Sequence, residues 1–174
     1  MRLAAALAAL LTITTAPLAR AQPVATQSPL AGLTFLIGNW SSGRGQVADT
    51  GAASSGRSTM TSEAGGAVIL RRDHTDLLDK AGRPTGGFDQ IMMIYPEAGT
   101  IRADYSDGTH VIHYVSATVE PGVAVTFTSA ARPGVPTFRL AYRLIAPDRL
   151  SVWFGMAPPG GEDFRPIATG ELRK

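Results

Sequence analysis

The feature that most limits the fold of this sequence is a regular succession of short extended segments and turns after residue 67. Eight segments rich in apolar, β-branched and aromatic residues are expected to be strands, at 68–77, 88–95, 100–105, 110–118, 123–129, 137–145, 150–156 and 167–172. Turn residues separate them, and Asp107-Gly108 is the clearest hairpin turn because both residues tolerate positive φ. Since no helical pattern intervenes, the sequence predicts an antiparallel sandwich or barrel.

Alternation of side chains within these segments supports the prediction. In 137–145 one face is mainly apolar and includes Tyr142, whereas the other carries Arg139 and Arg143. Residues 39–47 are a further candidate strand, and 30–37 is a short helical segment. The stretch 41–66 is rich in Gly, Ala, Ser and Thr, which indicates either a flexible excursion or short strands. Of the two architectures we favour a single up-and-down antiparallel β-barrel of about ten strands with a short N-terminal helix.

The N-terminal residues have the pattern of an export signal. Arg2 precedes an apolar run over 3–16, and Ala19-Arg20-Ala21 fits a small-residue cleavage site. We therefore expect a signal peptide at 1–21, a polar leader at 22–29 and one barrel domain at 30–174. The expected location is the periplasm or the extracellular medium, with no membrane span in the mature form. A retained N-terminal anchor is the alternative.

The composition excludes several kinds of site. The chain has no cysteine, which rules out a disulfide, a cysteine zinc site and a thiol nucleophile. Removal of residues 1–21 reduces the 16 Lys and Arg residues to 14, equal to the 14 Asp and Glu residues. A neutral mature chain lacks the basic footprint of a nucleic-acid-binding protein. We expect no nucleic-acid partner, no metal and no cofactor, and the oligomeric state stays open.

The segment that ends in Gly38-Asn-Trp40 resembles the opening of a calycin-type barrel, the superfamily of lipocalins, fatty-acid-binding proteins and nitrobindins. The rest of the chain resembles secreted bacterial members of that group. In calycins a Gly-x-Trp stands where a short helix becomes the first strand, and a basic residue near the end of the last strand packs over the Trp. The resemblance implies structural roles for Gly38, Trp40 and Arg173.

Polar residues on the predicted strands are candidates for binding a ligand in a barrel interior. His74 shares a strand face with Arg72 and Asp76, and a His–carboxylate pair would orient the imidazole. The alternative is a solvated strand with cross-strand charge pairs. Arg139 and Arg143 share a face, and a guanidinium suits a carboxylate because it binds both oxygens. The full predicted set is Arg72, His74, Tyr95, Tyr105, His113, Arg139 and Arg143.

The leading functional hypothesis is an exported barrel that binds a small hydrophobic molecule, with one or two inward polar groups for a carboxylate or carbonyl. A second hypothesis is a cyclase-, isomerase- or dehydratase-type enzyme that uses His74–Asp76 or His113–Asp104 as an acid/base pair. A third is a haem-binding, nitrobindin-like protein, although nitrobindins place their axial His near the C-terminal end and this chain has no His after 113. A filled barrel with a structural role is the remaining class.

Overall fold

The computed structural model describes residues 28–46 and 53–174. The predicted signal peptide and most of the polar leader therefore lie outside the described residues. Over the described ranges, no helix has both the length and the apolar character needed to cross a membrane.

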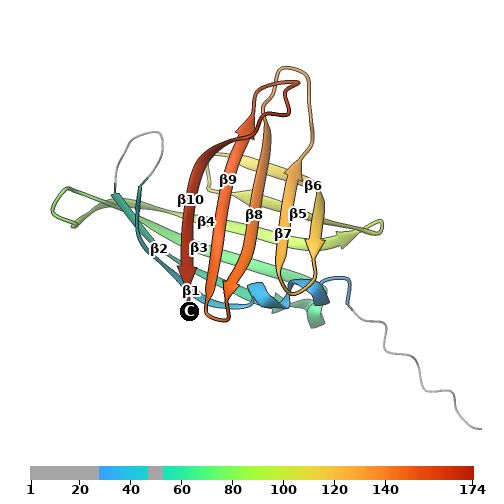
Figure 1. The fold of residues 1–174 in the computed structure, drawn as a ribbon, viewed down its shortest axis with the longest axis horizontal. Helices are drawn as coiled ribbons and strands as arrows, with labels where there is room; N and C mark the ends of the chain where they lie inside the picture. Colours follow the sequence, from blue (N-terminus) through green and yellow to red (C-terminus); the bar gives the residue numbers. More distant parts are fainter. Residues whose placement is uncertain (1–27, 47–52) are drawn as a thin grey trace, which may run out of the picture.

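Ten antiparallel strands form one closed barrel, in which each strand pairs with its neighbours along the chain and β1 pairs with β10 (Figure 1). This confirms the predicted all-β barrel and excludes the sandwich. The strands are β1 (Gly38–Gln46), β2 (Ala53–Glu63), β3 (Val68–Leu78), β4 (Pro84–Glu97), β5 (Thr100–Ser106), β6 (Val111–Glu120), β7 (Ala124–Ser129), β8 (Thr137–Ala146), β9 (Arg149–Ala157) and β10 (Arg165–Arg173).

The small-residue stretch 41–66 contains a long strand, which resolves the two alternatives left by its composition. Strand β2 runs for 11 residues and pairs with β3 along its whole length. Ser54, Gly56 and Ser58 alternate along its inner face, opposite Leu77, Thr75 and Asp73 of β3. Small side chains at these positions leave room inside the barrel, so the composition that resembles a flexible linker serves the interior instead.

One end of the barrel is closed by a short 3-10 helix, η1 (Ala31–Leu36). Leu33 and Leu36 are fully buried there, and Gly122 in the β6–β7 turn donates a backbone hydrogen bond to Gly32. We call this the closed end. Inward side chains from all round the wall fill the barrel next to it, including Met60, Ile69, Met92, Ile94, Phe127, Leu140 and Leu150.

Trp40 links the helix to the closed end of the barrel. Its indole Nε1 donates a 2.7 Å hydrogen bond to the Leu36 carbonyl, and its side chain is almost wholly buried. The chain turns from η1 into β1 at Gly38, which has a φ of 144°. The backbone conformation therefore favours glycine, and a Cβ there would also displace the Lys174 side chain, whose Cε would lie only 2.8 Å away.

The cation above Trp40 is Lys174, in place of the expected Arg173. Lys174 Nζ lies 4.6 Å from the centre of the Trp40 ring system. Leu172 packs against the core, so Arg173 falls on the outer face of β10 by strand alternation. The chain leaves the strand at Lys174, which frees this residue to fold over the end of the barrel.

We predict that Trp40→Ala lowers the free energy of unfolding by about 3–5 kcal/mol, because a buried aromatic ring and its hydrogen bond are lost. Lys174→Ala, which removes only the exposed cation–π contact, is expected to cost about 0.5–1 kcal/mol. Urea unfolding of both variants measures the two values. Equal losses in the two variants would contradict the role assigned to Trp40.

Candidate functional site

The inward side chains become accessible with distance from the closed end. On β3, Ile69 is 3% exposed and Arg71 is 9% exposed, whereas Asp73 and Thr75 further along are only partly buried. On β4, Met92 is fully buried, but Phe88 on the same face is 37% exposed. Beyond Arg71 the inner face of the barrel is therefore accessible to solvent, and we call this accessible half of the interior the cup.

Strand β10 forms an open side of the cup. It pairs with β1 only through Ser41↔Arg173 and Ser42↔Leu172, so the seam between the two strands is short. Beyond the seam, Ala168 and Gly170 are exposed although they pair with the inward residues Phe154 and Val152. A Cβ added at Gly170 would meet no atom within 4 Å. Among the described residues, none therefore fills the space directly in front of Gly170.

A buried guanidinium forms the floor of the cup. Arg71 Nε donates a 2.6 Å hydrogen bond to Asp73 Oδ2, and Nη2 pairs with the same carboxylate. Nη1 donates a 2.6 Å hydrogen bond to the Tyr142 hydroxyl on β8, and Nη2 donates to Gln90 Oε1 at 3.3 Å. The guanidinium also lies 6.0 Å from the ring centre of Tyr105. This cluster joins β3, β4 and β8 across the interior.

The cluster contains an ion pair, Arg71 with Asp73, whose two charges cancel. Burial acts to lower the pKa of Arg71, but Tyr142 and Asp73 outweigh it and the net shift is upward. Burial raises the pKa of Tyr142 to about 12 and that of Tyr105 to about 12. At neutral pH the floor therefore contains one cation, one carboxylate and uncharged phenols.

Two polar atoms at the floor have no hydrogen-bond partner among the described residues. They are Asp73 Oδ1 and Ser58 Oγ. Ser58 is 4% exposed, and the two residues pair across β2 and β3, which places them side by side on the inner wall. A buried carboxylate oxygen without a partner is costly, so Asp73 Oδ1 is an acceptor that a nearby donor would stabilise. Both atoms are covered by neighbouring groups, so a donor reaches them only when the side chains of the floor move.

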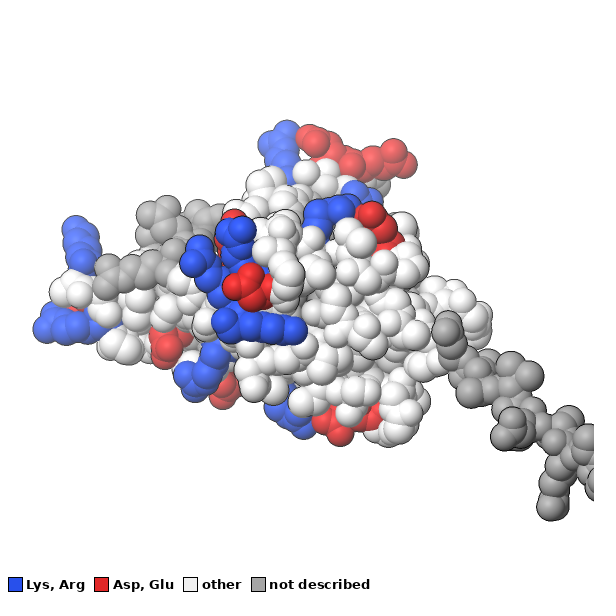
Figure 2. Space-filling view, turned by 60° about the horizontal axis from the view of Figure 1, so that its bottom comes forward, with Lys and Arg blue, Asp and Glu red and all other residues white. Residues whose placement is uncertain are grey.

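Of the predicted ligand-binding residues, only Tyr105 faces the interior. Arg72, His74, Tyr95, His113, Arg139 and Arg143 lie on the outer wall, because their strands present the other set of alternate residues to the core. Arg143 pairs with Glu120, and Arg139 lies 3.8 Å from the Phe164 ring centre. Figure 2 shows positive and negative groups interspersed on one outer face of the barrel.

The His–carboxylate pairs of the enzyme hypothesis form, but outside the barrel. His74 Nε2 lies 3.2 Å from Asp76 Oδ1, and its Nδ1 lies 2.7 Å from Asp89 Oδ1. His113 Nδ1 lies 2.6 Å from Asp104 Oδ1. His110, the third histidine of the chain, is in the β5–β6 turn beside Asp107. No imidazole therefore reaches the cup as an acid, a base or an axial haem ligand.

The sequence contains a signal for the floor that our prediction did not use. Arg71, Asp73 and Thr75 alternate on the face of β3 opposite to Arg72 and His74, but Ile69 and Leu70 put apolar residues on both faces and leave the inward one undecided. Tyr142 stands on the apolar face of its strand, which marks it as inward. Its partner Arg71 is 71 residues away, and only the barrel closure brings the two together.

The sequence matches no protein-family model and no curated protein, so the site is interpreted from its geometry. Over 28–46 and 53–174, no group of three or more His, Asp or Glu side chains is placed to hold a metal ion. The chemistry offered by the cup is thus apolar contact, a neutral ion pair and two free acceptor atoms.

Tyr142→Phe is expected to lower the free energy of unfolding by about 1–3 kcal/mol, because it leaves a buried N–H of Arg71 without its oxygen acceptor. Tyr95→Phe is the matched control, since the Tyr95 hydroxyl donates to Asp104 on the outer wall. That change is expected to stay within about 0.5 kcal/mol. Chemical denaturation compares the two, and a neutral Tyr142→Phe would contradict the role of the floor.

His74 is expected to titrate above its ordinary pKa of 6.5, mainly because of the hydrogen bond to Asp89, with a further contribution from Asp76. A raised folded-state pKa stabilises the fold below the unfolded-state value, and this stability is lost as pH rises through the folded-state pKa. Asp89→Asn should therefore destabilise more at about pH 5.5 than at about pH 8.5. NMR titration of the imidazole and urea unfolding at both pH values check this, and an unshifted pKa would contradict it.

Proposed function

We propose that this protein binds a small, mainly apolar molecule in the cup, with a hydroxyl or amide group of the ligand donating a hydrogen bond to Asp73 Oδ1. The observation that carries the proposal is this unpartnered, buried carboxylate oxygen, which a ligand donor reaches when the side chains of the floor move. Phe138 and Phe154 stack with ring centres 5.9 Å apart on the wall, and Val152 continues the apolar surface. Burial of ligand hydrocarbon there contributes about 25 cal/mol per Å².

The charge of the floor favours a neutral ligand over an acid. Arg71 directs its donors to Asp73, Tyr142, Gln90 and the Met92 sulfur. A carboxylate ligand would have to displace one of these partners and would add a second negative charge beside Asp73. A hydroxyl or amide donor requires neither change, because it uses an acceptor that is already free.

The wider setting of the proposal is an exported, calycin-like binding protein of the periplasm or extracellular medium. A closed antiparallel barrel that begins with Gly38-Asn-Trp40 is compatible with that group, and the N-terminal pattern of 1–21 supports export. Placement of every histidine outside the interior makes binding a better account of the cup than His-dependent catalysis or haem ligation.

The test uses Gly170→Leu, which places a side chain in the empty space before β10, and Thr169→Leu as its outward-facing neighbour. Displacement of the neutral dye Nile red by 1-decanol and by decanoate measures affinity. We expect 1-decanol to bind more tightly than decanoate, and Gly170→Leu to weaken its binding by about tenfold or more, equivalent to about 1.4 kcal/mol.

Thr169→Leu is expected to bind like the wild type, and thermal unfolding confirms that both variants are folded. If Gly170→Leu is stable and binds 1-decanol as well as the wild type does, the cup is not the binding site. If decanoate binds more tightly than 1-decanol, the proposed hydrogen bond to Asp73 is wrong. Native mass spectrometry of protein purified without detergent shows any ligand carried from the producing cell.

A further inference from the structure

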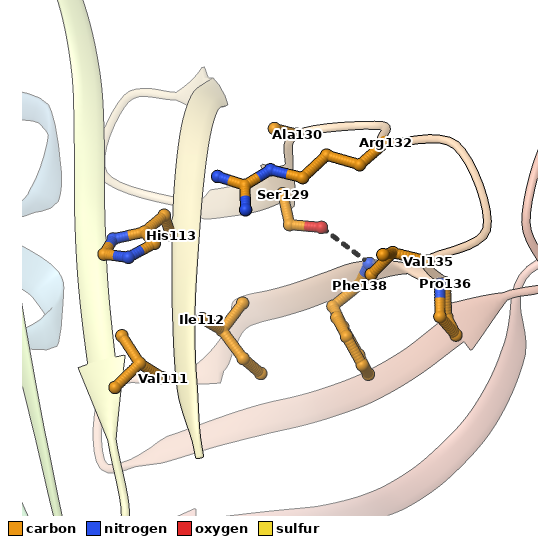
Figure 3. A pocket seen from close by; sticks show the side chains of 9 residues that line it. All are labelled: Val111, Ile112, His113, Ser129, Ala130, Arg132, Val135, Pro136 and Phe138. Atoms are coloured by element: carbon orange, nitrogen blue, oxygen red, sulfur yellow. Dashed lines mark hydrogen bonds between the residues drawn. The ribbon is translucent and has the colours of Figure 1, made fainter.

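A second hollow lies in the barrel wall, away from the floor of the cup. Pairing between β6 and β7 begins at Tyr114↔Ser129, so the start of β6 (111–113) has β5 as its strand partner among the described residues. The loop 130–136 arches over the gap. Between them is a pocket of about 80 Å³, seen from close by in Figure 3.

The rim of this wall pocket carries two nitrogen-rich side chains, Arg132 and His113. The Arg132 side chain extends from the loop toward His113 on the opposite rim (Figure 3). Arg132 has no hydrogen bond or ion pair from its side chain to any described residue, unlike Arg143 with Glu120 or Arg165 with Asp163. His113 is oriented through Nδ1 by Asp104, which leaves Nε2 without a partner among the described residues. No carboxylate lines the pocket itself.

The remaining walls of the pocket are largely apolar. Val111, Ile112, Val135 and Pro136 contribute aliphatic surface, and Phe138 closes the inner side. The Ser129 hydroxyl accepts a 2.8 Å hydrogen bond from the Phe138 backbone N–H, which leaves its own O–H as a further donor at the pocket. The volume is roughly half that of an apolar cavity of about 150 Å³ that holds benzene. It therefore suits a group of only a few heavy atoms.

We propose that this wall pocket binds a short-chain monocarboxylate, with the carboxylate on Arg132 beside His113 and the alkyl tail between Val135 and Ile112. A guanidinium forms two parallel hydrogen bonds with a carboxylate, and a tail of three carbons matches the small apolar space. A phosphate would leave that apolar wall uncovered, and a neutral molecule would leave Arg132 without a partner. The site is distinct from the cup, although Phe138 lies between the two, and it does not depend on the neutral ligand proposed there.

The test is an NMR titration of the ¹⁵N-labelled protein with sodium butyrate at constant ionic strength, with butyramide as the uncharged analogue. We expect saturable shifts confined to 111–113 and 130–138 with butyrate and much smaller shifts with butyramide. Arg132→Gln should weaken butyrate binding by about tenfold or more, as expected for the loss of a charge-assisted hydrogen bond. Arg143→Gln is the control, because it removes an arginine of the outer wall that lies outside the pocket.

A second variant tests the pocket without touching Arg132. Val135 is 44% exposed, so Val135→Asp adds a negative charge at the rim at little cost in stability, and it should abolish the butyrate shifts. Equal shifts with butyramide, unchanged binding by Arg132→Gln or Val135→Asp, or shifts centred on Asp73 and Gln90 would each overturn the proposal. The last result would instead place the acid in the cup, so failure of the two proposals can be told apart.

Discussion

The interior of this barrel depends on the buried guanidinium of Arg71. A charge in that position is tolerated only because Asp73 neutralises it and Tyr142 and Gln90 accept its remaining hydrogen bonds. These partners come from different walls, so the cluster fixes the distance between β3 and β8. It also separates the two halves of the interior. Apolar side chains fill the space on the closed-end side, and the open cup begins on the other.

The barrel is thus closed at the η1 end and accessible at the opposite end. Near η1, Trp40 and Gly38 join the helix to β1, and Lys174 covers the indole. Away from it, the β1–β10 seam stops after two residue pairs, and no described residue covers the inner face of β10 at Gly170. A barrel built this way keeps its strand edges paired at the closed end while leaving access to its interior from the other.

The two proposed sites differ in charge because their arginines differ in partners. Arg71 is neutralised by a neighbouring carboxylate, so the cup has no excess charge and a free acceptor at Asp73 Oδ1. Arg132 is on a loop beside an apolar gap, and no carboxylate lines that pocket. The same side-chain type therefore selects a neutral donor group in one place and an anion in the other. This difference between the two sites cannot be predicted from total charge or composition.

Much of the fold follows from local patterns in the sequence. Alternation and turn residues predict nine of the strands to within a few residues, since a strand with one buried face needs a period of two and a tight turn needs Gly, Pro or Asp. The small-residue strand β2 was harder to predict, because its Ser- and Gly-rich composition resembles that of a flexible linker. The roles of Gly38 and Trp40 were expected from the resemblance of their segment to a calycin opening, whereas the cation over Trp40 depends on where the last strand ends.

The candidate site shows where sequence reasoning stops. The sequence by itself determined the antiparallel strands and the apolar face on which Tyr142 stands, because both follow from neighbours along one strand. It did not determine which face of β3 turns inward, since Ile69 and Leu70 are apolar on both sides. Only the tertiary structure decided that Arg71 and Asp73 form the floor of the cup while Arg72 and His74 face outward. Asp73, which neutralises Arg71, is two residues away on the same strand, but Tyr142 is on a strand that meets Arg71 only when the barrel closes.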